Sequence, residues 1–142
     1  MILPDANLLL YAFNADAPGH DRAAQWWERC LNENEPVGLT WLVLLAVLRI
    51  STKPGIFDPP VSASIVLDDF EAWLARPHVR MLEPKSTHVQ AIRSIAEPLG
   101  LGGDIMNDVH LAALALEYGA VVHTADNDFA RFTGVRWHNP LA

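Results

Sequence analysis

Cysteine and basic residues are both scarce in this sequence of 142 residues. Cys30 is its one cysteine, so an internal disulfide is excluded and a reducing compartment, the cytoplasm, is the expected location. Only 10 Lys and Arg stand against 17 Asp and Glu, which gives a net charge of −7. So acidic a chain does not hold a polynucleotide by nonspecific attraction to phosphates. Any such ligand would need metal ions or a local basic patch.

Long apolar runs and several common binding motifs are also missing. The most hydrophobic stretch, residues 37–48, spans about a dozen residues, whereas a bilayer span needs about 20. The first residues lack the basic region of a signal peptide, so neither export nor membrane attachment is expected. There is no P-loop or glycine-rich dinucleotide fingerprint, and the histidines show no zinc-like pairing. These absences disfavour nucleotide cofactors and soft metals.

Short apolar stretches alternate with segments of helical spacing along the whole chain. This alternation predicts one α/β domain over residues 1–142, with a short central parallel sheet flanked by helices. Residues 8–13 are interpreted as an apolar turn and residues 51–60, rich in Pro and Gly, as a loop. The helix at 41–50 is apolar nearly all round, which predicts burial in the core or in a subunit contact. We expect strands at 1–3, 37–39, 79–82, 121–123 and 135–137, and helices at 20–32, 41–50, 62–74, 86–96 and 104–118.

Three aspartates lie where predicted elements begin or end. Asp5 and Asp126 each follow a short apolar stretch, so both are expected at the carboxyl edge of a parallel sheet, where ligands bind. Asp108 lies near the start of the helix at 104–118, and a helix that feeds a parallel strand starts at that same edge. The three carboxylates are therefore expected to converge. Asp104, one turn earlier on the same helix face, either joins them or caps the helix.

Converging carboxylates indicate a divalent-cation site. Hard oxygen ligands suit Mg²⁺ or Mn²⁺, and such a site can activate a water for in-line attack on a phosphodiester. Each aspartate also has a structural explanation: Asp5 as a helix cap, Asp108 as a solvated helix acid and Asp126 in an Asx-turn. For any one of them alone the structural explanation is preferred. Their expected convergence favours the metal site.

Several motifs of the chain resemble a known family. Residues 5–7, residues 108–115 followed by Gly119, and residues 124–129 resemble the PIN domain, specifically the VapC toxins of type II toxin-antitoxin systems. The match runs in order across almost the whole chain, and residues 39–52 resemble one VapC subgroup. The resemblance implies a three-layer α/β/α PIN fold and a Mg²⁺- or Mn²⁺-dependent endoribonuclease that hydrolyses RNA with a metal-activated water. It also implies a homodimer, silenced by a small VapB antitoxin that inserts a segment into the active-site groove.

The resemblance also gives roles to individual residues, carried over by position. Asp5, Asp108 and Asp126 match the catalytic acids that bind the metal. The auxiliary positions are Asp128, which matches a further acid, and Asn7 and Thr124, which match polar residues that orient the carboxylates.

One departure from the family pattern concerns the helix at 41–50. Many family members carry a glutamate there, and aligning on residues 47–50 puts Ala46 at its position. Either Asp104 supplies the missing carboxylate from one turn before Asp108, or the site holds one metal that RNA phosphates help to complete. Loss of activity is a third explanation, in which a degenerate domain binds antitoxin or RNA without cleaving it.

Two further predictions concern phosphate binding and a rival chemistry. Arg49 and Lys53 are candidate RNA phosphate contacts because they follow the apolar helix and enter the loop, although surface solvation explains them equally well. A small-molecule phosphohydrolase with Asp5 as nucleophile is the other class of enzyme considered. It is disfavoured because it predicts a second aspartate two residues on, where the sequence has Asn7.

Overall fold

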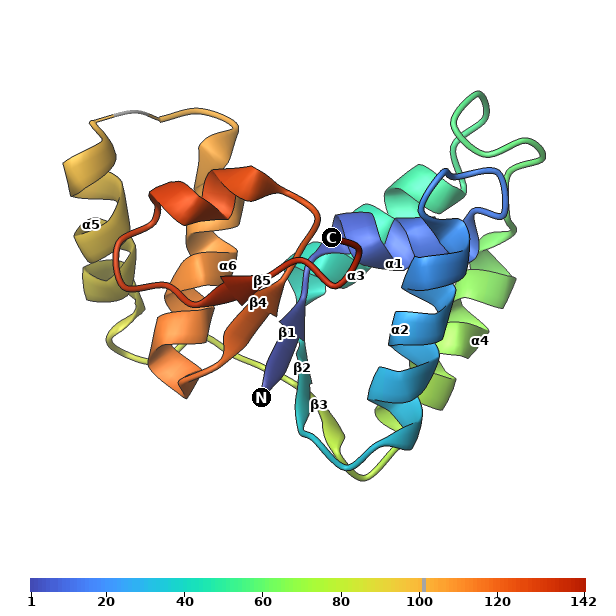
Figure 1. Cartoon of the computed structure of the whole chain (residues 1–142), viewed down its shortest axis with the longest axis horizontal. Coiled ribbons are helices and arrows are strands. Elements are labelled where there is room, and N and C mark those ends of the chain that lie inside the picture. Colours follow the sequence, from blue (N-terminus) through green and yellow to red (C-terminus); the bar gives the residue numbers. More distant parts are fainter. Residues whose placement is uncertain (101) are drawn as a thin grey trace.

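A parallel sheet forms the centre of the protein, with the strand order β3-β2-β1-β4-β5 (Figure 1). The computed structural model describes residues 1–100 and 102–142. The parallel sheet confirms the predicted α/β class. Its strands are β1 Ile2–Pro4, β2 Val37–Leu39, β3 Val79–Met81, β4 Val121–His123 and β5 Trp137–His138.

Helices cover both faces of this sheet, which confirms the three-layer arrangement. In Figure 1, α5 and α6 lie on one side of the strands and α1, α2 and α4 on the other. The helix α3 packs against α1 and α4. The helices are α1 Ala6–Phe13, α2 His20–Asn32, α3 Trp41–Ser51, α4 Ala63–Leu74, α5 His88–Leu99 and α6 Ile105–Tyr118, and η1 Asn127–Arg131 is a 3₁₀ helix.

Three of the predicted elements differ from the structure. The apolar turn predicted at residues 8–13 was wrong, because the Asp5 carboxylate accepts the Ala6 N–H at 2.7 Å and starts a regular helix there. The helix predicted at 86–96 begins and ends later, at His88 and Leu99. Pro98 lies inside its last turn, and Gly100, with φ at 63°, caps its end. The last strand begins at Trp137 rather than Val135, because the Val135 N–H is used by a turn to the Phe132 carbonyl oxygen.

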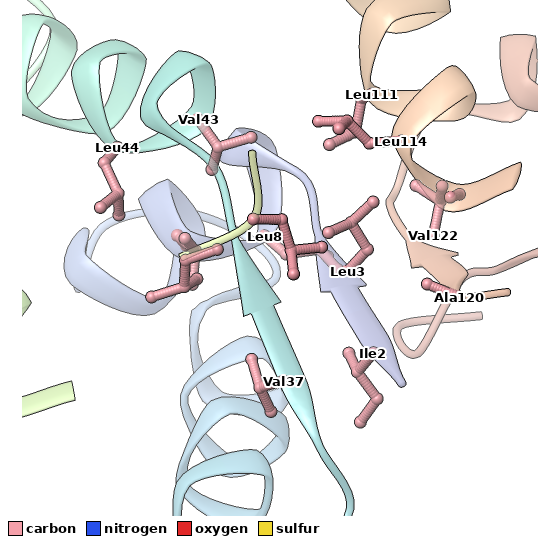
Figure 2. Close-up of a cluster of buried hydrophobic side chains, with 14 of the residues drawn as sticks. Ile2, Leu3, Leu8, Val37, Val43, Leu44, Leu111, Leu114, Ala120 and Val122 are labelled. Carbon is pink, nitrogen blue, oxygen red and sulfur yellow. The ribbon is translucent and has the colours of Figure 1, made fainter. Parts of the chain in front are cut away.

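The core lies between the sheet and the helices that pack against it near its carboxyl edge. Figure 2 shows Leu3 of β1 between Leu8 of α1 and the α6 side chains Leu111 and Leu114. All four of these leucines are at most 2% exposed. Burial of each leucine side chain contributes about 2 kcal/mol to the stability of the folded state. Tight packing therefore fixes the ends of β1 and the first turns of α6 relative to one another.

The helix α3, predicted to be buried in the core or in a subunit contact, is covered on one face only in the single chain. Val43, Leu44 and Val47 pack into the core, but Trp41 is 53% and Leu45 57% exposed. An apolar helix with one covered face leaves the other for solvent or a partner.

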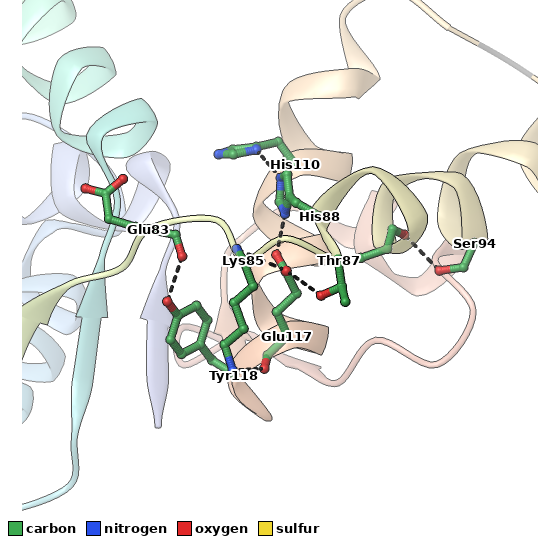
Figure 3. A network of polar contacts seen from close by, with 9 residues as sticks. Glu83, Lys85, Thr87, His88, Ser94, His110, Glu117 and Tyr118 are labelled. Atoms are coloured by element: carbon green, nitrogen blue, oxygen red, sulfur yellow. Dashed lines mark hydrogen bonds and ion pairs between the residues drawn. The ribbon is translucent and has the colours of Figure 1, made fainter.

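A polar network joins the loop before α5 to the end of α6 (Figure 3). The Glu117 side chain is 2% exposed and accepts hydrogen bonds from Thr87 Oγ1 at 3.0 Å, from the Lys85 N–H at 3.2 Å and from His88 Nδ1. His88 Nε2 lies 2.8 Å from His110 Nδ1. A buried carboxylate with several donors fixes how α5 packs on α6.

The strand order also locates the expected ligand site. From β1 the sheet extends through β2 and β3 in one direction and through β4 and β5 in the other. The carboxyl ends of β1 and β4 therefore flank the crevice where parallel α/β sheets bind ligands. Among the helices described, none is long and apolar enough to cross a membrane.

Candidate active site

Asp5 follows β1 directly and is held in place by four contacts. Its N–H donates to the His123 carbonyl oxygen of β4 at 2.9 Å. One carboxylate oxygen, Oδ1, accepts the Ala6 N–H, and the other, Oδ2, accepts the Thr124 hydroxyl at 2.8 Å and the Asn7 amide at 3.4 Å. The end of β1 thus meets the end of β4 through this side chain.

Thr124 and Asn7 connect Asp5 to Asp126. The fully buried Thr124 Oγ1 accepts hydrogen bonds from Asn7 Nδ2 at 3.2 Å and from the Asp126 N–H at 3.0 Å. Asn7 Oδ1 in turn accepts the Ala125 N–H at 3.2 Å. These bonds give Asn7 and Thr124 the contacts needed to orient the carboxylates around them.

Asp108 reaches the same edge from α6. This helix runs back along the sheet before β4, so its first turn, which contains Asp108, lies at the carboxyl edge. Burial, and after it the negative charges of Asp5, Asp126 and Asp128, together raise the pKa of Asp108 to about 6. Burial also raises the pKa of Asp5 above 3.8, while the bonds from Thr124 and Ala6 lower it and the charge of Asp126 raises it. The structure therefore brings these acids within electrostatic reach of one another.

The structural roles considered for single aspartates also occur here. Asp5 caps α1, and Asp126 Oδ1 accepts the Asp128 N–H at 2.8 Å, as in an Asx-turn. These bonds do not compete with ligand binding, because a carboxylate has about four lone-pair sites. Capping instead points each side chain toward the common edge.

A cleft of about 610 Å³ opens beside Asp5 and Asp108. Asp5 and Asp108 line it, together with Ala46 and Arg49 of α3. A glutamate at position 46 would therefore face this cleft, and the structure offers no carboxylate from α3 in its place. Lys53 is exposed and does not line the cleft. The remaining lining residues are Ala6, Leu42, Val43, Leu45, Leu48, Asn107 and Leu111.

Asp104 has a different position from the other acids. Its side chain makes no capping bond to α6, although it occupies the N-cap position. It lines a separate hollow of about 300 Å³ with Asp108, Asp128 and Arg131. Its charge is not among those that raise the pKa of Asp108.

Sequence reasoning missed Asn107 and Arg131. Asn107 lines the cleft beside Asp108. Arg131 forms an ion pair with Asp128 at 3.9 Å and brings a positive charge to the rim of the acidic cluster. A signal for Arg131 was present in its position three residues after Asp128, whereas nothing in the sequence singles out Asn107 from other polar residues.

The donor set fits a hard divalent cation held by few protein ligands. In the part of the chain described, no three His, Cys, Asp or Glu side chains are close enough to hold a metal by themselves. Mg²⁺ usually takes one or two carboxylates and completes its shell with water and substrate phosphates. The mutual repulsion of Asp5, Asp108 and Asp126 is the condition that a bound cation relieves.

Comparison with known proteins identifies the family of this chain. The family model of the PIN domain matches residues 2–135. The chain belongs to the PIN-domain family, and its curated relatives within that family are VapC proteins.

Two curated relatives match along nearly their full length. Ribonuclease VapC37 of Mycobacterium tuberculosis is 37% identical over 142 residues, which are 100% of this chain and 99% of that protein. VapC ribonuclease Mb2897 of Mycobacterium bovis is 38% identical over 141 residues, which are 99% of this chain and 96% of that protein.

Solved structures agree in fold. VapBC2 from Rickettsia felis, bound to a DNA fragment from its promoter, has a TM-score of 0.70 at 18% identity and 98% coverage of both chains. VapC20 of Mycobacterium tuberculosis, a sarcin-ricin loop cleaving toxin, has a TM-score of 0.68 at 17% identity and covers 96% of this chain and 99% of that one. At these identities the likeness shows the fold alone.

Proposed function

We propose that this protein is the toxin of a type II toxin-antitoxin pair and a metal-dependent endoribonuclease. The observation that carries the proposal is the convergence of Asp5, Asp108 and Asp126, of which Asp5 and Asp108 line one cleft. The relatives named ribonuclease VapC, at 37% and 38% identity over nearly the whole chain, support the same function.

In this proposal Asp5, Asp108 and Asp126 hold the cation together with water and RNA phosphate oxygens, because no three carboxylates of the described residues lie close enough to hold it by themselves. Thr124 and Asn7 orient the carboxylate of Asp5. Mg²⁺ or Mn²⁺, when bound, supplies Lewis acidity that lowers the pKa of a water and offsets charge on the scissile phosphate. Thr124 donates to Asp5 Oδ2, which orients that carboxylate and opposes the rise in its pKa that burial causes. Asp128, half a turn beyond Asp126, adds negative potential at the rim of the site.

Binding of the RNA backbone falls to the few cations near the cleft. Arg49 lines the cleft and is the better candidate for a phosphate contact, whereas Lys53 would contact RNA only outside it. With a net charge of −7, the protein depends on such local contacts and on the cation for affinity.

With Ala46 in place of the usual glutamate, we favour a site that holds a single cation. One observation supports it over compensation by Asp104: the hollow that Asp104 lines shares Asp108 with the cleft but contains neither Asp5 nor Ala46. RNA phosphate oxygens then complete the coordination.

The proposed partners are a VapB antitoxin and a second copy of the chain. VapBC complexes of similar fold support an antitoxin partner. The exposed side chains Trp41 and Leu45 of α3 are the apolar surface that supports a homodimer. A cytoplasmic location follows from the RNA substrate and agrees with the reduced, buried Cys30.

Cleavage of total RNA by the purified, antitoxin-free protein tests the proposal. Discrete fragments in Mg²⁺ or Mn²⁺, lost in EDTA and in Asp5→Ala, are expected. The second candidate function is a binding module without catalysis, and Ala46 is the observation that favours it. Failure of a folded, Mn²⁺-loaded protein to cleave any RNA, together with retained antitoxin binding, would establish that alternative.

A further inference from the structure

A second depression meets the proposed cation site at Asp108. This hollow beside η1 measures about 300 Å³ and lies where η1 passes the first turn of α6 (Figure 1). Asp108 lines both the hollow and the cleft, whereas Asp5, Ala46 and Arg49 line the cleft alone. The two depressions therefore adjoin at one of the proposed metal ligands. The hollow is lined by Gly102, Asp104, Ile105, Asp108, Asp128 and Arg131.

Arg131 is the one cationic side chain among the described residues that line this hollow, and its backbone is firmly held. Asp126 Oδ1 caps η1 by accepting the Asp128 N–H at 2.8 Å. Phe129 of η1 is fully buried and packs edge-on against Phe132, with ring centroids 5.1 Å apart. The Arg131 side chain is nevertheless 43% exposed. A fixed backbone therefore presents a guanidinium group to solvent at the hollow.

The guanidinium group of Arg131 is only loosely engaged by the protein. Its ion pair with Asp128 is 3.9 Å long, and the Asp128 side chain is itself 57% exposed. A charge-assisted hydrogen bond is shorter, at about 2.7–2.9 Å, and exposed pairs add little to stability. In the described part of the chain the Arg131 side chain donates no hydrogen bond, so its donors are available to a ligand. Four other arginines do donate side-chain hydrogen bonds: Arg22, Arg76, Arg93 and Arg136.

The charges around the hollow decide which group of an RNA it accepts. In the proposed function Asp108 coordinates the cation, and Asp128 is paired with Arg131. Asp104 is then the one lining acid whose charge is not offset. A guanidinium fork matches phosphate, because it can donate two parallel hydrogen bonds to the oxygens. A cation bound at Asp108 would attract the same phosphate and offset the charge of Asp104.

We infer that Arg131 binds the RNA phosphate next to the scissile one. The strand runs from the cleft, across the cation site at Asp108, into the hollow beside η1. Arg49 holds its backbone in the cleft and Arg131 holds it in the hollow. Such contacts fix the register of a strand without reading its bases. The identity of the ligand as RNA rests on the proposed function.

RNA binding at several salt concentrations tests this inference with the full-length protein. A fluorescein-labelled single-stranded RNA is titrated in Ca²⁺, which also takes oxygen ligands, and gels confirm that the RNA stays intact. In Arg131→Gln the plot of log affinity against log salt should lose about 0.7 in slope, the amount for one single-strand phosphate. Affinity should fall about five- to tenfold. The matched control Arg93→Gln removes an exposed arginine that lines neither depression and should change neither quantity.

Two further variants separate charge from local structure. Arg131→Lys keeps the positive charge without the fork, so it should retain the wild-type slope and lose part of the affinity. Asp104→Asn should bind RNA about two- to threefold more tightly, because it removes the acid that opposes the phosphate.

Three results would overturn the inference. A wild-type slope in Arg131→Gln would show that this side chain contacts no phosphate. An equal loss of slope in Arg131→Lys would assign the effect to the structure of η1 rather than to charge. Weaker RNA binding by Asp104→Asn would mean that its carboxylate binds the cation or a base, and that the hollow does not take a phosphate.

Cleavage in Mn²⁺ is measured on the same samples, so failure of the proposed function can be distinguished. RNA that binds through Arg131 but stays intact would remove the nuclease activity and leave this inference standing. A wild type that binds no RNA would remove both.

Discussion

Thr124 donates its hydroxyl hydrogen to the Asp5 carboxylate at 2.8 Å across a sequence separation of 119 residues. The same hydroxyl oxygen accepts the Asp126 N–H, so one side chain connects two of the proposed metal ligands. Because β1 and β4 are adjacent and parallel, their carboxyl ends are side by side and a short threonine spans them. The bond therefore relates the order of the strands directly to the geometry of the site.

Thr124→Val should weaken Mn²⁺ binding and RNA cleavage by about 10- to 100-fold, because Asp5 loses the donor that orients it. The folded protein should lose about 1–3 kcal/mol, since partners of a buried hydroxyl are left unpaired. Binding isotherms, cleavage rates and urea denaturation measure these effects. Thr124→Ser keeps the hydroxyl and is the control; equal damage in both variants would refute an orienting role.

Asp108→Asn should stabilise the metal-free protein near neutral pH while abolishing cleavage. The folded-state pKa of Asp108, about 6, lies above the ordinary value of 3.8, so the folded state binds the extra proton between these values. Wild-type stability from this group is therefore present at low pH and is lost as the pH rises from 3.8 to about 6. Denaturation in EDTA across this window measures the difference. A variant whose advantage does not grow with pH would contradict the raised pKa.

Ala46→Glu should add a carboxylate to the cleft and increase Mn²⁺ affinity or stoichiometry, because position 46 faces Asp5 and Asp108 there. Without metal the variant should be less stable than the wild type, owing to added like-charge repulsion. Calorimetric titration reports both affinity and stoichiometry. Ala46→Gln has nearly the same size without the charge, and an identical isotherm for the two variants would show that the side chain does not reach the cation.

Glu117→Ala should destabilise the protein by about 3 kcal/mol, because it leaves the donors of His88 and Thr87 without their buried acceptor. Mn²⁺ affinity should change little, since none of the proposed metal ligands belongs to this network, which Figure 3 draws from α5, α6 and the segment before α5. Chemical denaturation and a metal isotherm on the same sample separate the two effects. A large loss of metal affinity in the folded variant would mean that the network also fixes Asp108.

Most of the fold was predictable from the sequence because strand and helix periods alternate clearly. The position of Asp108 followed from one topological rule, that a helix before a parallel strand starts at its carboxyl edge. The helix α1 was missed because Asp5 was interpreted as a ligand, although the same carboxylate starts that helix. The two roles of Asp5, helix cap and proposed ligand, are compatible, because the cap uses only one of the carboxylate's lone pairs.

Side-chain partners across elements were not predictable. The pairing of Trp26 with His123, and the absence of any partner for Trp27, depend on which face of α2 meets the sheet, and neighbouring tryptophans give no local indication of it. Lys53 was placed near the cleft by its distance along the chain, but α3 ends before it and the chain turns away. Arg49, one turn earlier, lines the cleft instead.

The most direct measurement is Mn²⁺ binding by the wild type, Asp108→Asn and Asp104→Asn under identical conditions. Our account predicts one saturable site in the wild type, loss of at least about 10-fold in affinity for Asp108→Asn and little change for Asp104→Asn. Equal losses in the two variants would assign Asp104 to the site in place of the missing glutamate. Unchanged affinity in Asp108→Asn would contradict the central claim that the carboxylates at the ends of β1, β4 and the start of α6 form a single cation site.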